Sequence, residues 1–174
     1  MKSHPHSCSQ RGAGLIEVLV AVLLVTLGLL GAIRIQMRSI EYTVDTERRQ
    51  MASMLATELL ETMRGDTARI LDPKGLPQAG LAGYQKAAGA ALPEATAAVC
   101  QPLPAEPATR MGCWGQRAMR LVPELTPGLV TSAFAVSADS AGLVSVTVAW
   151  PVKKGQCLDG NDDEICSFTL RSRL

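Results

Sequence analysis

The sequence predicts an α+β protein in which one long N-terminal helix packs on a small antiparallel sheet. The helix is indicated by residues 13–64, which contain no proline and only three glycines among residues that favour helices. The sheet is indicated by alternating, β-branched segments at 129–136, 143–150 and 166–174. A Ser-Ala-Asp-Ser-Ala-Gly stretch separates the first two segments and is typical of a hairpin turn.

The long helix divides into two halves of different character. Residues 13–33 are apolar, Gly or Thr except for Glu17, and at 1.5 Å per residue they would span ~31 Å, enough to cross a bilayer core. Residues 34–65 form the amphipathic half, which ends at Gly65 after the cation Arg64. Gaps of three and four residues place on one helical face Ile33, Met37, Ile40, Val44, Met51, Met54, Leu55, Leu59 and Met63.

The charges around the apolar half predict its orientation in a membrane. Positive charge precedes it and none lies inside it, which favours a cytoplasmic N-terminus and a C-terminal domain outside, in the periplasm of a bacterium. A secretory signal peptide is the ordinary alternative, but its apolar core is usually about 7–15 residues, and no small-residue cleavage site follows Ile33. A membrane-embedded carboxylate is costly, so Glu17 either reaches water at the interface or serves a function.

Residues 66–174 are expected to form a periplasmic α+β domain, called the head below. The stretch 66–108 is rich in Pro, Gly and Ala and is expected to be a long connection with short elements at most. Apolar spacing over 111–125 predicts a short second helix, which Pro127-Gly128 would stop, and the strands follow it.

Four cysteines in the head are expected to form structural disulfides, each worth roughly 2–4 kcal/mol to a small domain. Three pairings are possible. The local one, Cys100 with Cys113 and Cys157 with Cys166, is favoured over the two that link the distant pairs.

The loop between Cys157 and Cys166 contains a weak calcium candidate. Asp159, Asn161 and Asp163 have the spacing of oxygen ligands at the start of a calcium loop. The sixth position is Glu164 instead of Gly, and Asx residues in a tight turn explain the same pattern without a metal. No metal site is therefore predicted.

The residues around Glu17, GAGLIEVLV at 12–20, resemble the class III signal of type IV prepilins. The resemblance implies that residues 1–12 are a leader, that prepilin peptidase cleaves between Gly12 and Ala13, and that Ala13 is N-methylated. Ala13 stands where the family usually has Phe. Glu17 then becomes the fifth residue of the mature chain, a position that serves assembly in this family.

Further stretches look like the PilV-type minor pilins of type IV pili. They are GLLG at 28–31 followed by Gln36, MLATELLETMR at 54–64, and a helix with Trp114 that leads through Pro127-Gly128 into VSVTVAW at 144–150. The resemblance implies a type IV pilin-like fold and a role in initiating or capping pilus assembly. Implied partners are other minor pilins, the major pilin, prepilin peptidase and the inner-membrane assembly platform. The implied location is the inner membrane and then the fibre, near its tip.

Charge and composition exclude several other functions. The chain has 17 Lys+Arg against 16 Asp+Glu and only 3% aromatic residues, so no nucleic-acid partner is expected. Loss of residues 1–12 would remove both histidines, and a chain without histidine cannot form a Ser-His-Asp, Cys-His or histidine–zinc site. We therefore expect neither an enzyme nor a cofactor.

Two alternatives remain at this point. A minor pseudopilin of a type II secretion system would carry the same signal and fold. A signal-anchored periplasmic enzyme or binding domain would keep its N-terminus intact and would need a pocket.

Overall fold

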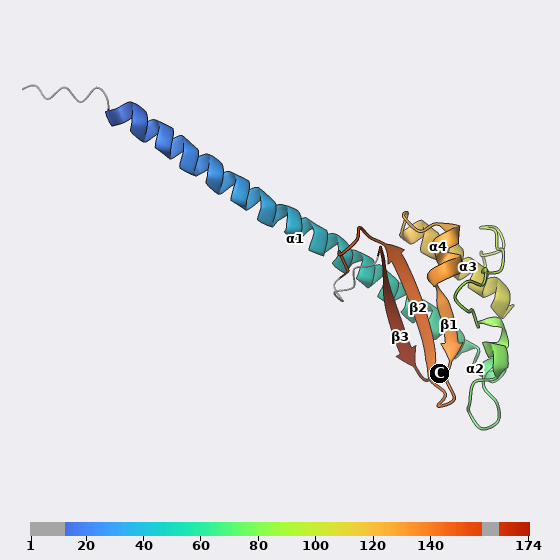
Figure 1. The fold of residues 1–174 in the computed structure, drawn as a ribbon. Helices are drawn as coiled ribbons and strands as arrows, with labels where there is room; N and C mark the ends of the chain where they lie inside the picture. Colours follow the sequence, from blue (N-terminus) through green and yellow to red (C-terminus); the bar gives the residue numbers. More distant parts are fainter. Residues whose placement is uncertain (1–12, 158–163) are drawn as a thin grey trace, which may run out of the picture. The chain divides into compact units, whose positions relative to one another are not determined.

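A computed structural model describes residues 13–157 and 164–174. The chain divides into two compact units, Met1–Glu41 and Tyr42–Leu174. The helix α1 (Ala13–Gly65) contributes to both units and has Arg64 in its last turn, where a cation is favourable (Figure 1). The prediction of one uninterrupted helix that ends at Gly65 is confirmed.

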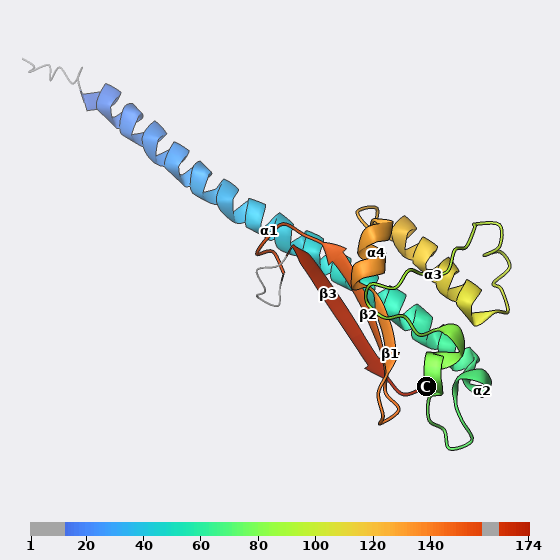
Figure 2. The ribbon, with the colours of Figure 1, turned by 45° about the vertical axis from the view of Figure 1, so that its right-hand side comes forward.

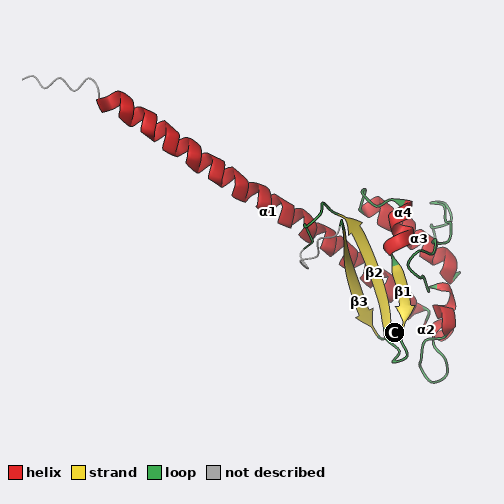
Figure 3. Cartoon of the chain, viewed as in Figure 1, coloured by secondary structure: helices red, strands yellow, loops and turns green. Residues whose placement is uncertain are grey.

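The sheet of the second unit has three antiparallel strands in the order β1-β2-β3 (Figure 3). They are β1 (Ala135–Ala138), β2 (Val144–Pro151) and β3 (Ile165–Ser172). The β1–β2 turn is the expected hairpin, in which Oδ1 of Asp139 accepts the backbone N–H groups of Ala141 and Leu143, both at 2.9 Å. The α+β class that the sequence predicts is therefore confirmed.

Short helices and the long connection complete the second unit. They are α2 (Thr67–Ile70), the 3-10 helix η1 (Ala79–Gly83), α3 (Pro107–Leu121) and α4 (Pro127–Ala133). In Figures 1 and 2, α3 and α4 lie toward the β1 edge of the sheet, and β3 forms the opposite edge.

One predicted strand is wrong over most of its length. Residues 129–133 of the strand expected at 129–136 belong to α4, because the Thr126 hydroxyl caps the helix by accepting the Leu129 N–H at 3.2 Å, and Pro127 occupies a first-turn position. Of the expected strand, only Ala135 and Val136 lie in β1 (Ala135–Ala138). The pair Pro127-Gly128 thus begins a helix, and α3 begins and ends four residues earlier than expected.

The core lies between the second half of α1 and the sheet. Of the residues predicted on the apolar face, Leu55, Leu59 and Met63 are buried. Met54 is 66% exposed, and Ile33, Met37, Ile40 and Val44 are exposed as well, so the predicted face is buried only in part. The observed buried stripe follows the helical period closely, since its members are Ala52, Leu55, Ala56, Leu59, Leu60 and Met63. The inward-facing sheet residues in the same core are Val136, Val144, Val146, Val148 and Trp150.

Candidate functional site

Most of the exposed large hydrophobic side chains of the described chain lie in the apolar start of α1. Its large apolar side chains from Leu15 to Ile33 are each about half to three-quarters exposed, and no described residue covers them. An exposed apolar patch of this size marks a surface that another molecule covers. By length and composition, the helix matches a membrane anchor or a signal sequence.

The predicted processing residues lie at the beginning of this helix. Gly12 falls outside the described residues, and Ala13 is the first residue of α1. Glu17 is exposed on the first helical turns, and among the described residues no cation forms an ion pair with it. A carboxylate in an apolar segment is stable only with a countercharge or water, so Glu17 is available to a group from outside the chain.

The four head cysteines form two disulfides with the local pairing that the sequence favours. Cys100 joins Cys113, which ties the connection to α3, and Cys157 joins Cys166, which ties the residues after β2 to β3. Both Cα–Cα distances, 5.6 Å and 5.5 Å, are usual for a disulfide.

The weak calcium candidates are not placed by the structure. Asp159, Asn161 and Asp163 lie outside the described residues. Within the described ranges, no group of three or more His, Cys, Asp or Glu side chains is arranged to hold a metal ion.

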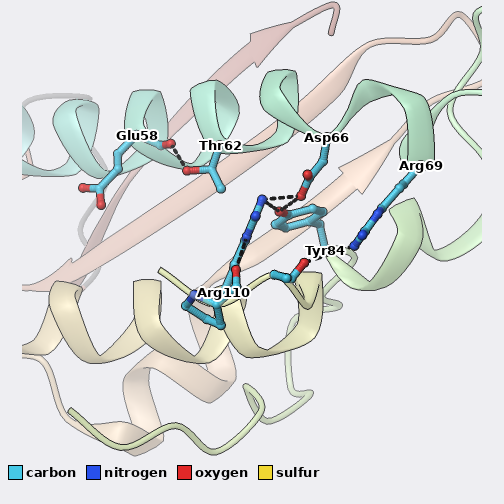
Figure 4. Close-up of polar contacts among 8 residues, drawn as sticks. Glu58, Thr62, Asp66, Arg69, Tyr84 and Arg110 are labelled. Carbon is cyan, nitrogen blue, oxygen red and sulfur yellow. Dashed lines mark hydrogen bonds and ion pairs between the residues drawn. The ribbon is translucent and has the colours of Figure 1, made fainter. Parts of the chain in front are cut away.

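A polar cluster joins the end of α1 to the connection and to α3 (Figure 4). The Tyr84 hydroxyl donates to Oδ2 of Asp66 at 2.5 Å, and Nη1 of Arg110 donates to the same oxygen at 2.5 Å. Arg110 also contacts the Tyr84 oxygen at 3.4 Å, and its Nε donates to the Pro104 carbonyl at 2.5 Å. The cluster fastens three segments that are far apart in the sequence.

The environment of this cluster favours a neutral phenol beside an ion pair. Burial, followed by the hydrogen bond to Asp66, raises the pKa of Tyr84 from its ordinary 10.0 to about 12. The pKa of Arg110 is also raised, chiefly by its hydrogen bond to the Tyr84 oxygen. Tyr84 therefore stays protonated and Arg110 charged, which suits a structural contact better than proton transfer near neutral pH.

Lys86 is a second buried polar residue that the sequence analysis did not single out. Its side chain is almost fully buried, and Nζ donates to the carbonyls of Phe134 (2.7 Å), Thr131 (2.9 Å) and Ala87 (3.3 Å). Two of these carbonyls lie at the end of α4, where a cation complements the helix dipole. Burial lowers the pKa of Lys86 below its ordinary value.

Asp45 of α1 is a third polar residue that the fold buries. The Trp150 indole Nε1 donates to Oδ1 of Asp45 at 3.1 Å, while Oδ2 of Asp45 has no hydrogen-bond partner among the described residues. A buried indole N–H requires an acceptor, and Asp45 supplies it from 105 residues away, a distance at which no local sequence pattern pairs the two residues.

These contacts define the class of the protein. It is an α+β protein whose described residues include two disulfides in the head and an apolar N-terminal helix of membrane-spanning length. No family model, curated protein or solved structure matches the chain.

Proposed function

We propose that this chain is a minor pilin of a type IV pilus. In this proposal, prepilin peptidase cleaves it after Gly12, residues 13–33 hold it in the inner membrane, and it then joins the fibre through that same helix. Its partners are other minor pilins, the major pilin and the inner-membrane assembly platform. The head lies in the periplasm before assembly, a compartment in which its disulfides form and persist.

A single observation supports this proposal most directly. Glu17 is the only ionisable residue of the exposed apolar segment, and it lies four residues after Ala13, the residue that cleavage would make the new N-terminus. Cleavage frees an α-amine on Ala13, and a carboxylate in an apolar environment needs an opposite charge. A neighbouring subunit's amine would supply that charge when the apolar helices pack together.

Processing is tested by measuring the N-terminal mass of the membrane-bound chain in cells with and without prepilin peptidase. We expect the chain to begin at Ala13 only when the peptidase is present. Gly12→Val should leave the leader attached, because the family's recognition pattern requires a small residue before the cleaved bond. Gly28→Val is the matched control, since it makes the same change inside the apolar segment and away from the cut. A different N-terminus, or normal trimming of Gly12→Val, would refute the prepilin assignment.

Assembly is tested separately with Glu17→Gln. This variant should insert and be cleaved normally, but sheared pili should contain several-fold less of it than of the wild type. Glu41→Gln is the control, because it neutralises an exposed carboxylate of α1 outside the apolar segment. Equal incorporation of Glu17→Gln and wild type would mean that Glu17 only reaches water at the interface.

Copy number distinguishes a minor subunit from a major one. Quantitative mass spectrometry of sheared pili should find this chain far below the major pilin, and deletion of its gene should reduce pilus number or twitching. An abundance equal to that of the major pilin would contradict the minor role. Recovery with a secretion system instead of with pili would favour the minor pseudopilin.

A further inference from the structure

The two edges of the sheet differ in whether another described segment pairs with them. At the β1 edge, Val136 and Lys86 exchange two backbone hydrogen bonds of 2.8 Å and 2.9 Å, so the connection covers that edge. At the other edge, β3 pairs only with β2, and no described segment pairs with its outer side (Figures 1 and 3).

The register identifies the backbone groups that point outward from β3. Val152 donates its backbone N–H to the Glu164 carbonyl at 2.9 Å, and in an antiparallel ladder every second residue pair is bonded in this way. Thr147 and Thr169 therefore form no backbone hydrogen bonds with each other. Side chains lie closer together in such pairs, which agrees with the 2.9 Å distance between the two hydroxyls. The outward N–H and C=O groups belong to Ile165, Ser167, Thr169 and Arg171.

This edge lacks the usual protection against pairing. Exposed edges are commonly blocked by proline, by charged side chains, especially lysine, or by short strands, whereas β3 has eight residues, no proline or lysine, and one charged residue, Arg171. It is also held firmly, since the Cys157–Cys166 disulfide fastens its start and Nη2 of Arg64 donates to the Ser172 hydroxyl at 2.8 Å near its end. A rigid edge loses little conformational entropy when a partner strand binds.

We propose that the outer edge of β3 binds an extended, acidic segment of a different protein by strand addition. Alternating outward donors and acceptors are matched by an extended backbone. Arg171 and Arg173 lie exposed at the end of this edge, and neither forms an ion pair within the described chain, so carboxylates of the partner would complement them. A second copy is the alternative occupant that the test must separate, because Asp162, Asp163 and Glu164 directly precede β3 in the sequence. This inference does not depend on the proposed function.

The test uses the full chain in nonionic detergent micelles and a synthetic probe. The probe is an acetylated eight-residue peptide of alternating threonine and valine that ends in two aspartates. Without it, amide exchange measured by NMR should be fast at residues 165, 167, 169 and 171 and slow at 166, 168 and 170. Saturating probe should slow the first set at least tenfold and leave the second set unchanged.

Two controls separate backbone pairing from other binding. The same peptide, N-methylated at every second amide, should bind the wild-type chain at least tenfold more weakly. The unmodified peptide should bind the double variant Ser167→Pro/Thr169→Pro at least tenfold more weakly than it binds the wild type. These prolines remove outward N–H groups and, at Thr169, the hydroxyl that contacts Thr147, but they remove no backbone hydrogen bond to β2, so the ladder with β2 should persist. Ser167→Ala should bind the probe as the wild type does.

Several results would overturn the proposal. They are the absence of probe binding, protection at amides outside β3, equal binding of the N-methylated peptide, and equal binding by a folded double-proline variant. If the double-proline variant does not fold, the N-methylated peptide on the wild-type chain still decides. Protection of the outward amides that grows with protein concentration, without probe, would identify a second copy as the occupant and refute the unlike partner.

Discussion

Tyr84→Phe removes one hydroxyl from the core and leaves the ring. Tyr84 is fully buried, and its hydroxyl donates to Asp66 at 2.5 Å, so the variant loses a hydrogen bond to a charged acceptor. Such a bond is worth about 1.5–3 kcal/mol. Asp66 keeps its ion pair with Arg110, and we expect a loss of about 2 kcal/mol in the free energy of unfolding near neutral pH.

The pH dependence of this loss is the sharper part of the prediction. The pKa of Tyr84 is raised to about 12 in the folded chain, mainly by burial. A raised pKa in the folded state adds to the free energy of unfolding. This contribution is fully present below the ordinary value near pH 10 and is lost as the pH rises toward 12. Two pKa units correspond to about 2.7 kcal/mol in all, and about half of this should be lost by pH 11. The difference in free energy of unfolding between the wild type and Tyr84→Phe should therefore decrease by about 1.3 kcal/mol between pH 9 and 11.

Guanidinium unfolding of the full chain in nonionic micelles measures this difference. Trp114 and Trp150 are both buried and report the unfolding of the head by fluorescence. Tyr42→Phe is the matched control, because it makes the same change at a tyrosine that is 57% exposed, and it should differ little from wild type at any pH. The prediction is refuted if the difference in free energy of unfolding between the wild type and Tyr84→Phe stays constant or increases from pH 9 to 11. It is also refuted if the difference between the wild type and Tyr42→Phe decreases by the same amount.

Three further substitutions test the packing of the head by the same unfolding assay. Lys86→Met should cost about 1–3 kcal/mol, because the Phe134 carbonyl loses its Lys86 donor while Thr131 still accepts the Gly89 N–H. Burial lowers the pKa of Lys86 in the folded chain, so the unfolded chain binds more protons at this residue. The free energy of unfolding of the wild type should therefore increase with rising pH up to about 10.4, and Lys86→Met should lack this increase. Gly112→Ala should destabilise by about 1–3 kcal/mol, since its Cβ would lie 2.4 Å from the Pro93 backbone oxygen. Gly115→Ala should cost less, because its Cβ meets only the flexible Leu92 side chain, and a larger loss at Gly115 than at Gly112 would contradict this ranking.

The parts of the fold that the sequence predicted correctly are those set by local periodicity. The long helix and strands β2 and β3 follow from runs of apolar residues with one clear period. The segment that became α4 has a β-branched pair, Val130 and Thr131, which locally favours a strand, but the Thr126 cap and Pro127 at the first turn outweigh that preference. A capping residue followed by proline was visible in the sequence and carried the stronger physical signal.

The buried polar contacts could not be predicted from local pattern. Asp66 meets Tyr84 and Arg110 across 18 and 44 residues, and Lys86 meets Phe134 across 48. Asp66, Arg110 and Lys86 are residue types that usually lie on the surface, so their type does not predict these inward contacts. The prediction that 66–108 forms a connection with short elements is confirmed, but its anchoring role emerges only from the structure.

The same connection determines how the sheet can be extended. Identical copies could add head to tail, β3 of one against β1 of the next, only if both edges were free. The backbone groups of Val136 on the outer side of β1 are already bonded to Lys86, so that repeating contact is blocked. A sheet that accepts a strand at one edge alone can end a row of strands but cannot propagate one. This asymmetry suits a subunit that meets unlike neighbours and is present in few copies, which is the behaviour expected of the proposed minor pilin.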